Sequence, residues 1–131
     1  MIVVDASALL AILEGEPDAA LYAEALADAD SALMSAATLI EAGLVMVNRH
    51  GPKAARKLHA LVREAGIEVE NVTPRHAQIA IDAFAIYGKG RQHKAGLNYG
   101  DCFVYALAKA TGLPLLFKGN DFSHTDLLSV L

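Results

Sequence analysis

The chain has 131 residues, of which 54% are hydrophobic, and its net charge is −4. This length suits one domain with a substantial core, and the acidic balance argues against indiscriminate coating of nucleic acid. No apolar run reaches the roughly 18 residues of a membrane span, and the N-terminus shows no basic leader, so we expect a cytoplasmic protein. A single cysteine, Cys102, excludes an internal disulfide.

Charge is unevenly distributed along the chain. Residues 1–48 carry eight acidic residues and no Lys or Arg, whereas residues 49–94 carry nine basic residues and four acidic ones. A local basic surface therefore remains available for a polyanion.

The first half of the chain begins with a strand. Residues 2–4 are β-favouring and apolar, which predicts a strand buried on both faces. A helix over 7–13 follows, capped by Asp5 or Ser7, then a helix over about 17–29 and a strand at 32–34. The next helix ends at Gly51, and another spans about 52–65.

The second half continues the alternation. Residues 67–72 read as an edge strand, and Thr73 caps a helix that ends at Gly88. Asn98 caps the next helix, which Gly112 closes, and a buried strand lies at 115–117. Residues 127–131 are expected to form a final short strand. Helical spacing predicts these packing residues: Leu21, Tyr22, Ala25 and Leu26; Ile40, Leu44 and Val47; Ala55, Leu58, Leu61, Val62 and Ala65; Ala77, Ala80, Ile81 and Phe84.

This order of strands and helices predicts an α/β fold with a mostly parallel sheet covered by helices on both faces. Asp5 ends the first strand and Asp121 follows the strand at 115–117, while Glu41 and Asp101 lie early in helices. Because ligands of open α/β sheets bind at the carboxyl ends of the strands, at least three of these carboxylates are expected to converge. Asp101 is the weakest member, since no clear strand precedes its helix.

Three of these acids also have purely structural explanations. Asp5 would cap the first helix, and Asp101 would complement the dipole of its own helix. Asp121 would be an ordinary turn residue.

Glu41 has a structural explanation that depends on where its helix starts. With Thr38 as the cap, Glu41 would complete a capping box; with Ser35 as the cap, it would lie well inside the helix. Its apolar neighbours make it the hardest of the four acids to explain as a solvated residue.

Several carboxylates at one sheet edge would repel one another and raise one another's pKa unless a cation neutralised them. Oxygen ligands without Cys or His partners favour Mg²⁺ or Mn²⁺ over zinc. Such an ion polarises a phosphoryl oxygen and lowers the pKa of a bound water, so no nucleophilic Ser or Cys is required. The residues thus predict phosphodiester hydrolysis.

Four segments together resemble a known family: Val3-Val4-Asp5-Ala6-Ser7-Ala8, Glu41 after Ser35 and Thr38, Leu97-Asn98-Tyr99-Gly100-Asp101-Cys102, and Leu116-Phe117-Lys118-Gly119-Asn120-Asp121-Phe122. In this order and spacing they resemble PIN-domain ribonucleases, specifically VapC-type toxins of bacterial type II toxin–antitoxin pairs. The resemblance covers essentially the whole chain. It implies a single PIN domain over 1–131, with a three-layer α/β/α sandwich and a mostly parallel central sheet.

The resemblance also implies an activity, a cofactor and partners. The activity is a Mg²⁺-dependent endoribonuclease, with Mn²⁺ as a substitute ion, that hydrolyses RNA with a metal-activated water. Asp5 and Asp101 would be the principal metal ligands, while Glu41 and Asp121, also catalytic, would hold metal-bound waters or a second ion. Ser7 would contact the metal-binding residues without binding the metal itself. The family further implies a homodimer and a VapB-type antitoxin that covers or enters the active site.

Lys89, Arg91 and Lys94 occupy a loop just before the Asp101 helix. They would guide an RNA backbone toward the metal; the alternative is a mobile, solvated loop. A second basic group, between Arg49 and Arg63, is expected to be the wet face of its helix.

Other protein classes also gather acids at a parallel-sheet edge. A receiver-type switch would suit Lys118 but needs an acidic pair after the first strand, and a haloacid-dehalogenase phosphatase needs Asp-x-Asp where this chain has Asp5-Ala6-Ser7. The alternative to a nuclease is a receiver-like or PIN-like interaction module without turnover. Cleavage of DNA stays open as well, since one metal site would hydrolyse either backbone.

Overall fold

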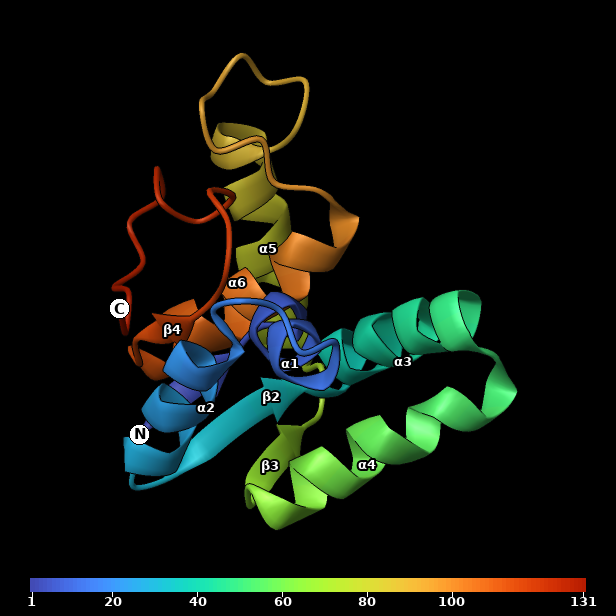
Figure 1. The fold of residues 1–131 in the computed structure, drawn as a ribbon. Coiled ribbons are helices and arrows are strands. Elements are labelled where there is room, and N and C mark those ends of the chain that lie inside the picture. Colours follow the sequence, from blue (N-terminus) through green and yellow to red (C-terminus); the bar gives the residue numbers. More distant parts are fainter.

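The computed structural model describes residues 1–131 and contains a four-stranded sheet with helices on both faces (Figure 1). The strands are β1 (Ile2–Val4), β2 (Ala32–Ser35), β3 (Ile67–Glu70) and β4 (Leu115–Leu116). All pairs are parallel and the strand order is β3-β2-β1-β4. The parallel sheet and the edge position of β3 are as the sequence predicts.

Six α-helices and one 3₁₀ turn connect the strands. They are α1 (Ala6–Leu13), α2 (Ala19–Asp28), α3 (Ala36–His50), η1 (Pro52–Ala54), α4 (Ala55–Glu64), α5 (Pro74–Tyr87) and α6 (Tyr99–Thr111). The predicted helices all occur, with ends within a few residues of those expected. No helix combines the length and apolar character of a membrane span.

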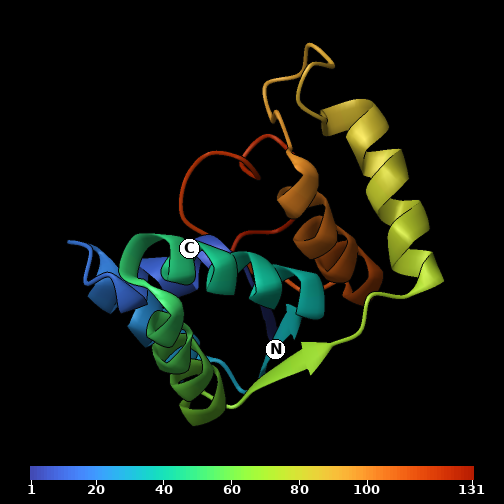
Figure 2. The same ribbon diagram turned by 90° about the vertical axis from the view of Figure 1, so that its right-hand side faces the viewer.

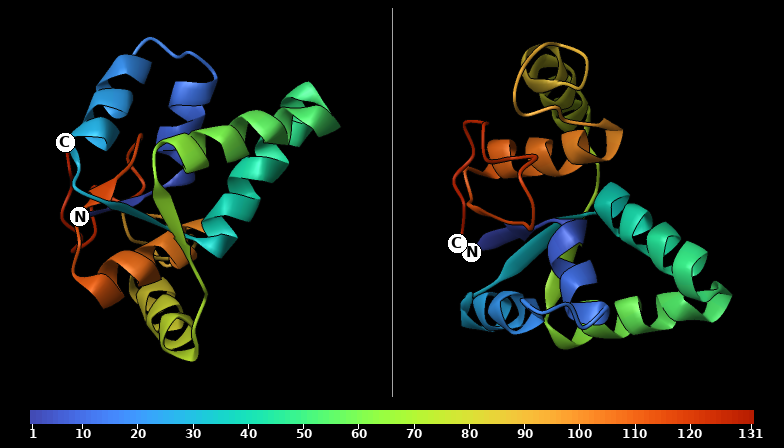
Figure 3. Two further views of the ribbon diagram at one scale, coloured as in Figure 1. Left: turned by 90° about the horizontal axis from the view of Figure 1, so that it is seen from below. Right: turned by 45° about the horizontal axis from the view of Figure 1, so that its top comes forward.

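The right-hand view of Figure 3 shows helices on both faces of the sheet, and a hydrophobic core lies on each face. In β1, Ile2 and Val4 pack in the core with α1, α2 and α4, whereas Val3 packs in the core with α5 and α6. Successive side chains of a strand point to opposite faces, so an uninterrupted apolar strand has to be covered on both. The three-layer α/β/α arrangement follows from this alternation.

The predicted apolar faces of three helices are wrong in part. Ile40 and Leu44 of α3 are each 61% exposed, and this helix instead buries Thr38, Ala42 and Met46. The reason is that α3 packs against both α1 and α6, and small side chains let helices approach closely. The same error affects Ile81 and Phe84, which are exposed while α5 buries Ala83, and Leu21 of α2, which is exposed.

The predicted strand at 127–131 is also wrong. Only a single parallel bridge joins Leu115 to Ser129, with hydrogen bonds from Leu115 N to Leu128 O and from Val130 N to Leu115 O. Since β4 has two residues, it offers too short an edge for a further paired strand.

Candidate active site

Asp5 lies where β1 ends and α1 begins. Its Oδ2 accepts hydrogen bonds from the Ser7 N–H at 3.1 Å and from Ser7 Oγ at 2.5 Å, so Asp5 is the N-cap of α1. The residue is only 6% exposed. Asp5 therefore does cap α1, and this role also holds its carboxylate at the carboxyl end of a central strand.

Ser7 connects Asp5 to the other side of the sheet edge. While its hydroxyl donates to Asp5, it accepts the backbone N–H of Lys118, just after β4, at 2.9 Å. Ser7 thus orients Asp5 and joins the chain segment that carries Asp121.

Asp101 is the third residue of α6 and closes a capping box with Asn98. The Asp101 N–H donates to Asn98 Oδ1 at 2.8 Å, and the Asn98 N–H donates to Asp101 Oδ2 at 3.0 Å. Asp101 is 7% exposed. No strand precedes α6, so the packing of this helix against β1 and β2 brings the carboxylate to the site.

Glu41 reaches the same site from α3. Ser35, not Thr38, caps this helix by accepting the Ala37 N–H, which places Glu41 inside the second turn. Its carboxylate lies against the start of α6: a Cβ built on Gly100 would meet Glu41 Oε2 at 1.7 Å. Gly100 therefore makes the room that Glu41 occupies. Sequence reasoning missed this role, although a glycine in the first turn of a helix costs stability and is a usable signal.

Three of the four acids, Asp5, Glu41 and Asp101, have a raised pKa. Burial raises the pKa of Asp5 despite the hydrogen bonds from Ser7, and the charge of Asp121 adds to the effect. Burial and the charge of Asp5 raise the pKa of Glu41. Burial raises the pKa of Asp101 to about 7. The hydrogen bond from the Asn98 N–H opposes this shift, and the charges of Asp121, Asp5 and Glu41 add to it. The structure thus gathers all four predicted carboxylates, with Asp121 as the exposed member.

The carboxylates are gathered more loosely than a closed metal cage requires. No three Asp, Glu, His or Cys side chains converge tightly enough to hold one ion by themselves. The Thr38 hydroxyl, on the buried side of α3 one turn before Glu41, has no hydrogen-bond partner although it is fully buried. An oxygen-rich site with direct ligation by one or two carboxylates is typical of Mg²⁺, which keeps several waters.

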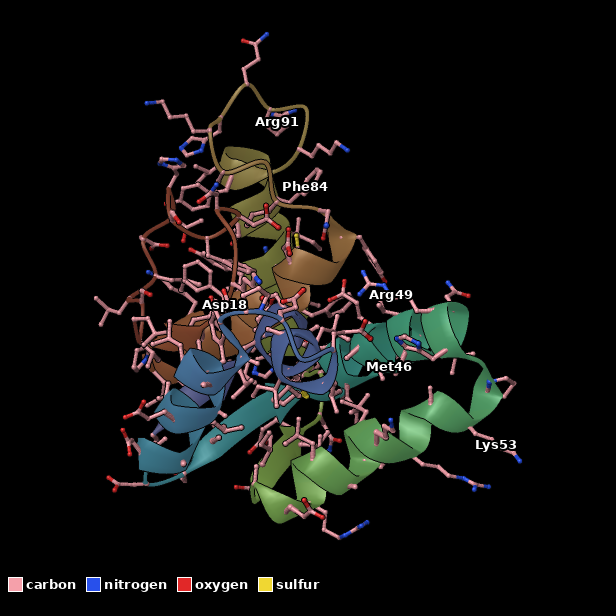
Figure 4. All side chains as sticks on the ribbon, viewed as in Figure 1. Asp18, Met46, Arg49, Lys53, Phe84 and Arg91 are labelled. Carbon is pink, nitrogen blue, oxygen red and sulfur yellow. The ribbon has the colours of Figure 1, made fainter.

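The basic loop between α5 and α6 is exposed over residues 89–94 and hydrogen-bonded at its base. Hydrogen bonds from Lys89 N to Leu97 O and from Leu97 N to Tyr87 O close its base, and Leu97 is fully buried. Arg91 Nε donates to the Ala85 carbonyl, and Figure 4 shows Arg91 on the loop above α5.

The second basic surface is separate from this loop. Lys53 lies at the far end of the arm formed by α3 and α4 (Figure 4), and this arm is apart from the loop between α5 and α6 (Figure 2). Arg49 and His50 face Glu14 at the end of α1.

A cavity of about 630 Å³ lies between α5 and the start of α6. Its walls include Phe84, Lys89, Tyr99 and Phe103, and the Tyr99 ring is packed edge-on against Phe103 with centroids 4.9 Å apart. Tyr99 is 80% exposed, so an aromatic surface and a lysine adjoin the start of the helix that carries Asp101.

Residues 2–128 match the PIN domain family, and the chain belongs to that family. Its relatives include ribonuclease VapC28 of Mycobacterium tuberculosis, 50% identical over 98% of this chain and 97% of that protein. Ribonuclease VapC of Mycolicibacterium smegmatis is 48% identical, with 98% of each chain covered. The family resemblance of the sequence is confirmed.

Solved structures agree with the fold. Mycobacterium tuberculosis VapC20, described as a toxin that cleaves the sarcin–ricin loop, superposes with a TM-score of 0.80 at 19% identity, covering 98% of this chain and 97% of that one. VapBC2 from Rickettsia felis, bound to a DNA fragment of its promoter, gives 0.75 at 14% identity, covering 98% and 96%. The predicted PIN-like α/β/α sandwich is therefore confirmed.

Proposed function

We propose that this chain is an endoribonuclease of the VapC type that hydrolyses RNA phosphodiester bonds at the acidic cluster. Curated relatives about half identical over nearly the full chain are named ribonucleases. The observation that carries the chemistry is the convergence of four carboxylates from separate elements, in which burial and neighbouring carboxylates raise the pKa of Asp5, Glu41 and Asp101. Such a cluster is costly unless a cation is bound, which disfavours an interaction module without turnover.

The donor set fits Mg²⁺, with Mn²⁺ as a substitute. Asp5 and Asp101, the two most buried carboxylates, would bind the ion directly, and Glu41 and Asp121 would hold its waters. When bound, the ion would polarise the phosphoryl group, lower the pKa of water and neutralise the leaving oxygen. In the reaction, the oxygen of water forms a bond to phosphorus, the bond from phosphorus to the leaving ribose oxygen breaks, and that oxygen takes up a proton.

The protein's own groups provide the positioning. Ser7 fixes the orientation of Asp5, and the capping box fixes that of Asp101. Lys89, which lines the cavity between α5 and α6, and Lys94 would contact the RNA backbone. Arg91, whose Nε is engaged with a carbonyl of α5, would contribute to the same surface through its remaining donors.

The proposal includes two protein partners and one domain boundary. A VapB-type antitoxin is expected because toxin–antitoxin complexes share this fold. A second copy of the chain is expected because Ile40, Leu44 and Ile81 are exposed on the helices that flank α6; light scattering of the purified protein would test it. Residues 1–131 would form a single PIN domain.

The test is cleavage of total cellular RNA by the purified, antitoxin-free protein in Mg²⁺, in Mn²⁺ and in chelator. We expect metal-dependent cleavage that Asp101→Asn abolishes. Asp82→Asn is the matched control, because Asp82 is an exposed carboxylate of α5 that only accepts a bond from Gln78. Cleavage that persists in chelator or in Asp101→Asn would contradict the proposal, and a parallel DNA substrate tests the remaining alternative.

A further inference from the structure

Lys118 lies two residues after the end of β4, and both its backbone and its side chain form hydrogen bonds. Its backbone N–H donates to Ser7 Oγ at 2.9 Å. Its Nζ donates to Glu16 Oε2 and to Asp18 Oδ1, both at 2.8 Å. Each of the three charged side chains is only about a third exposed. Lys118 thus joins the turn between α1 and α2 to the hydroxyl that orients Asp5.

The Asp18 carboxylate binds Lys118 instead of capping its own helix, α2. Asp18 is the N-cap residue of α2 (Figure 4), yet its side chain makes no capping hydrogen bond. Asp is among the strongest capping residues, because its carboxylate can accept a free N–H of the first helical turn. Here the carboxylate is turned to Lys118 instead, and hydrogen bonds to Asp18 and Glu16 raise the pKa of the Lys118 ammonium, which stays charged.

The segment after Lys118 is fixed at its other end as well. Gly119 adopts a φ of +104°, which favours glycine. Phe122 is buried, and its ring packs edge-on against Phe117 with centroids 5.4 Å apart. Asp121 is carried between these two anchors, at the position from which its charge acts on Asp5 and Asp101.

We propose that Lys118 is a positioning residue for the acidic cluster. Its ammonium, bound by Glu16 and Asp18, holds residues 118–121 against Ser7, so that Ser7 keeps Asp5 oriented and Asp121 stays beside the other acids. The inference rests on the proposed nuclease function. Lys118 does not act by binding RNA phosphate, because its ammonium is already shared by two carboxylates.

The test compares three changes with one control. Lys118→Met removes the charge at similar length, Lys118→Arg restores it, and the double change Glu16→Gln with Asp18→Asn neutralises the partners. Lys109→Met is the matched control, because Lys109 forms an ion pair with Asp126 outside the acidic cluster. The measurements are kcat and KM on one RNA, Mn²⁺ affinity by calorimetry without RNA, and hydrogen exchange of the Lys118 amide.

For Lys118→Met and the double change we expect kcat to fall roughly 10- to 100-fold with little change in KM, as for residues that orient metal ligands. Mn²⁺ affinity should fall and the Lys118 amide should exchange faster, while Lys118→Arg restores all three. Lys109→Met should change none of them. A rise in KM without a fall in kcat, or a fall in kcat no larger than that of Lys109→Met, would overturn the proposal. If the unmodified protein cleaves no RNA, the proposed function fails, but Mn²⁺ affinity and amide exchange still decide the role of Lys118.

Discussion

Asp101→Asn should stabilise the metal-free protein at neutral and basic pH. Burial and neighbouring carboxylates raise the pKa of Asp101 from 3.8 to about 7, so the folded state binds a proton more tightly than the unfolded state. Stability therefore falls as the pH rises from about 4 to about 7, and the full cost is present above that range. This pKa difference corresponds to roughly 4 kcal/mol in the free energy of unfolding. It is an upper value, because part of the shift comes from neighbouring carboxylates that also titrate. Asparagine keeps an oxygen that can accept the Asn98 N–H, so the cap survives the substitution.

The assay is urea unfolding of both proteins in chelator at pH 5 and pH 8. The variant should be more stable at pH 8, and the gap should be smaller at pH 5. Asp126→Asn is the control of opposite sign: although partial burial raises the pKa of Asp126, hydrogen bonds from Lys109 and Tyr105 outweigh it and lower the value. That change should therefore destabilise the protein above about pH 4. If Asp101→Asn is no more stable than the parent at pH 8, the ionised Asp101 carboxylate does not destabilise the metal-free protein and the reasoning is refuted.

Two further predictions concern the surroundings of the acids. Gly100→Ala should lower kcat while the protein stays folded, because the new Cβ displaces Glu41. Gly43→Ala is the control, since its Cβ would meet only Leu58 at an ordinary 3.7 Å. Equal losses of kcat in both variants would contradict the role of Gly100. Replacing Lys89 and Lys94 by Ala should weaken RNA binding and reduce the salt slope by about 0.7 for each phosphate that the protein no longer neutralises. An unchanged slope in a filter-binding titration would remove the loop from the RNA site.

The sequence predicts the sheet better than the helix faces, and the reason is physical. An apolar run such as β1 has one explanation, burial on both sides, whereas a helix such as α3 has apolar residues around most of its surface. Which side of α3 is buried depends on its neighbours: close packing against α1 and α6 favours Ala42 over Ile40 and Leu44. That choice is made by tertiary contacts, which helical spacing does not contain.

The residues of the site are also only partly predictable from the sequence. The sequence identifies the four acids, but not Gly100 or the ammonium of Lys118, because their roles depend on contacts between residues far apart in the chain. Lys118 Nζ reaches a partner about a hundred positions away, at Asp18. The glycine that admits Glu41 lies on a different helix from that acid.

The structural and functional explanations of Asp5 and Asp101 turn out not to compete. Asp5 is the N-cap of α1 and Asp101 closes the cap of α6, and in each case one oxygen of the carboxylate binds an N–H at the helix start. Asp5 lies at the sheet edge because β1 ends and α1 begins there, whereas the packing of α6 against β1 and β2 brings Asp101 to the same place. In both cases the cap fixes the orientation of the carboxylate. A substitution that keeps the cap and removes the charge, such as Asp to Asn, is therefore the change that separates folding from the proposed chemistry.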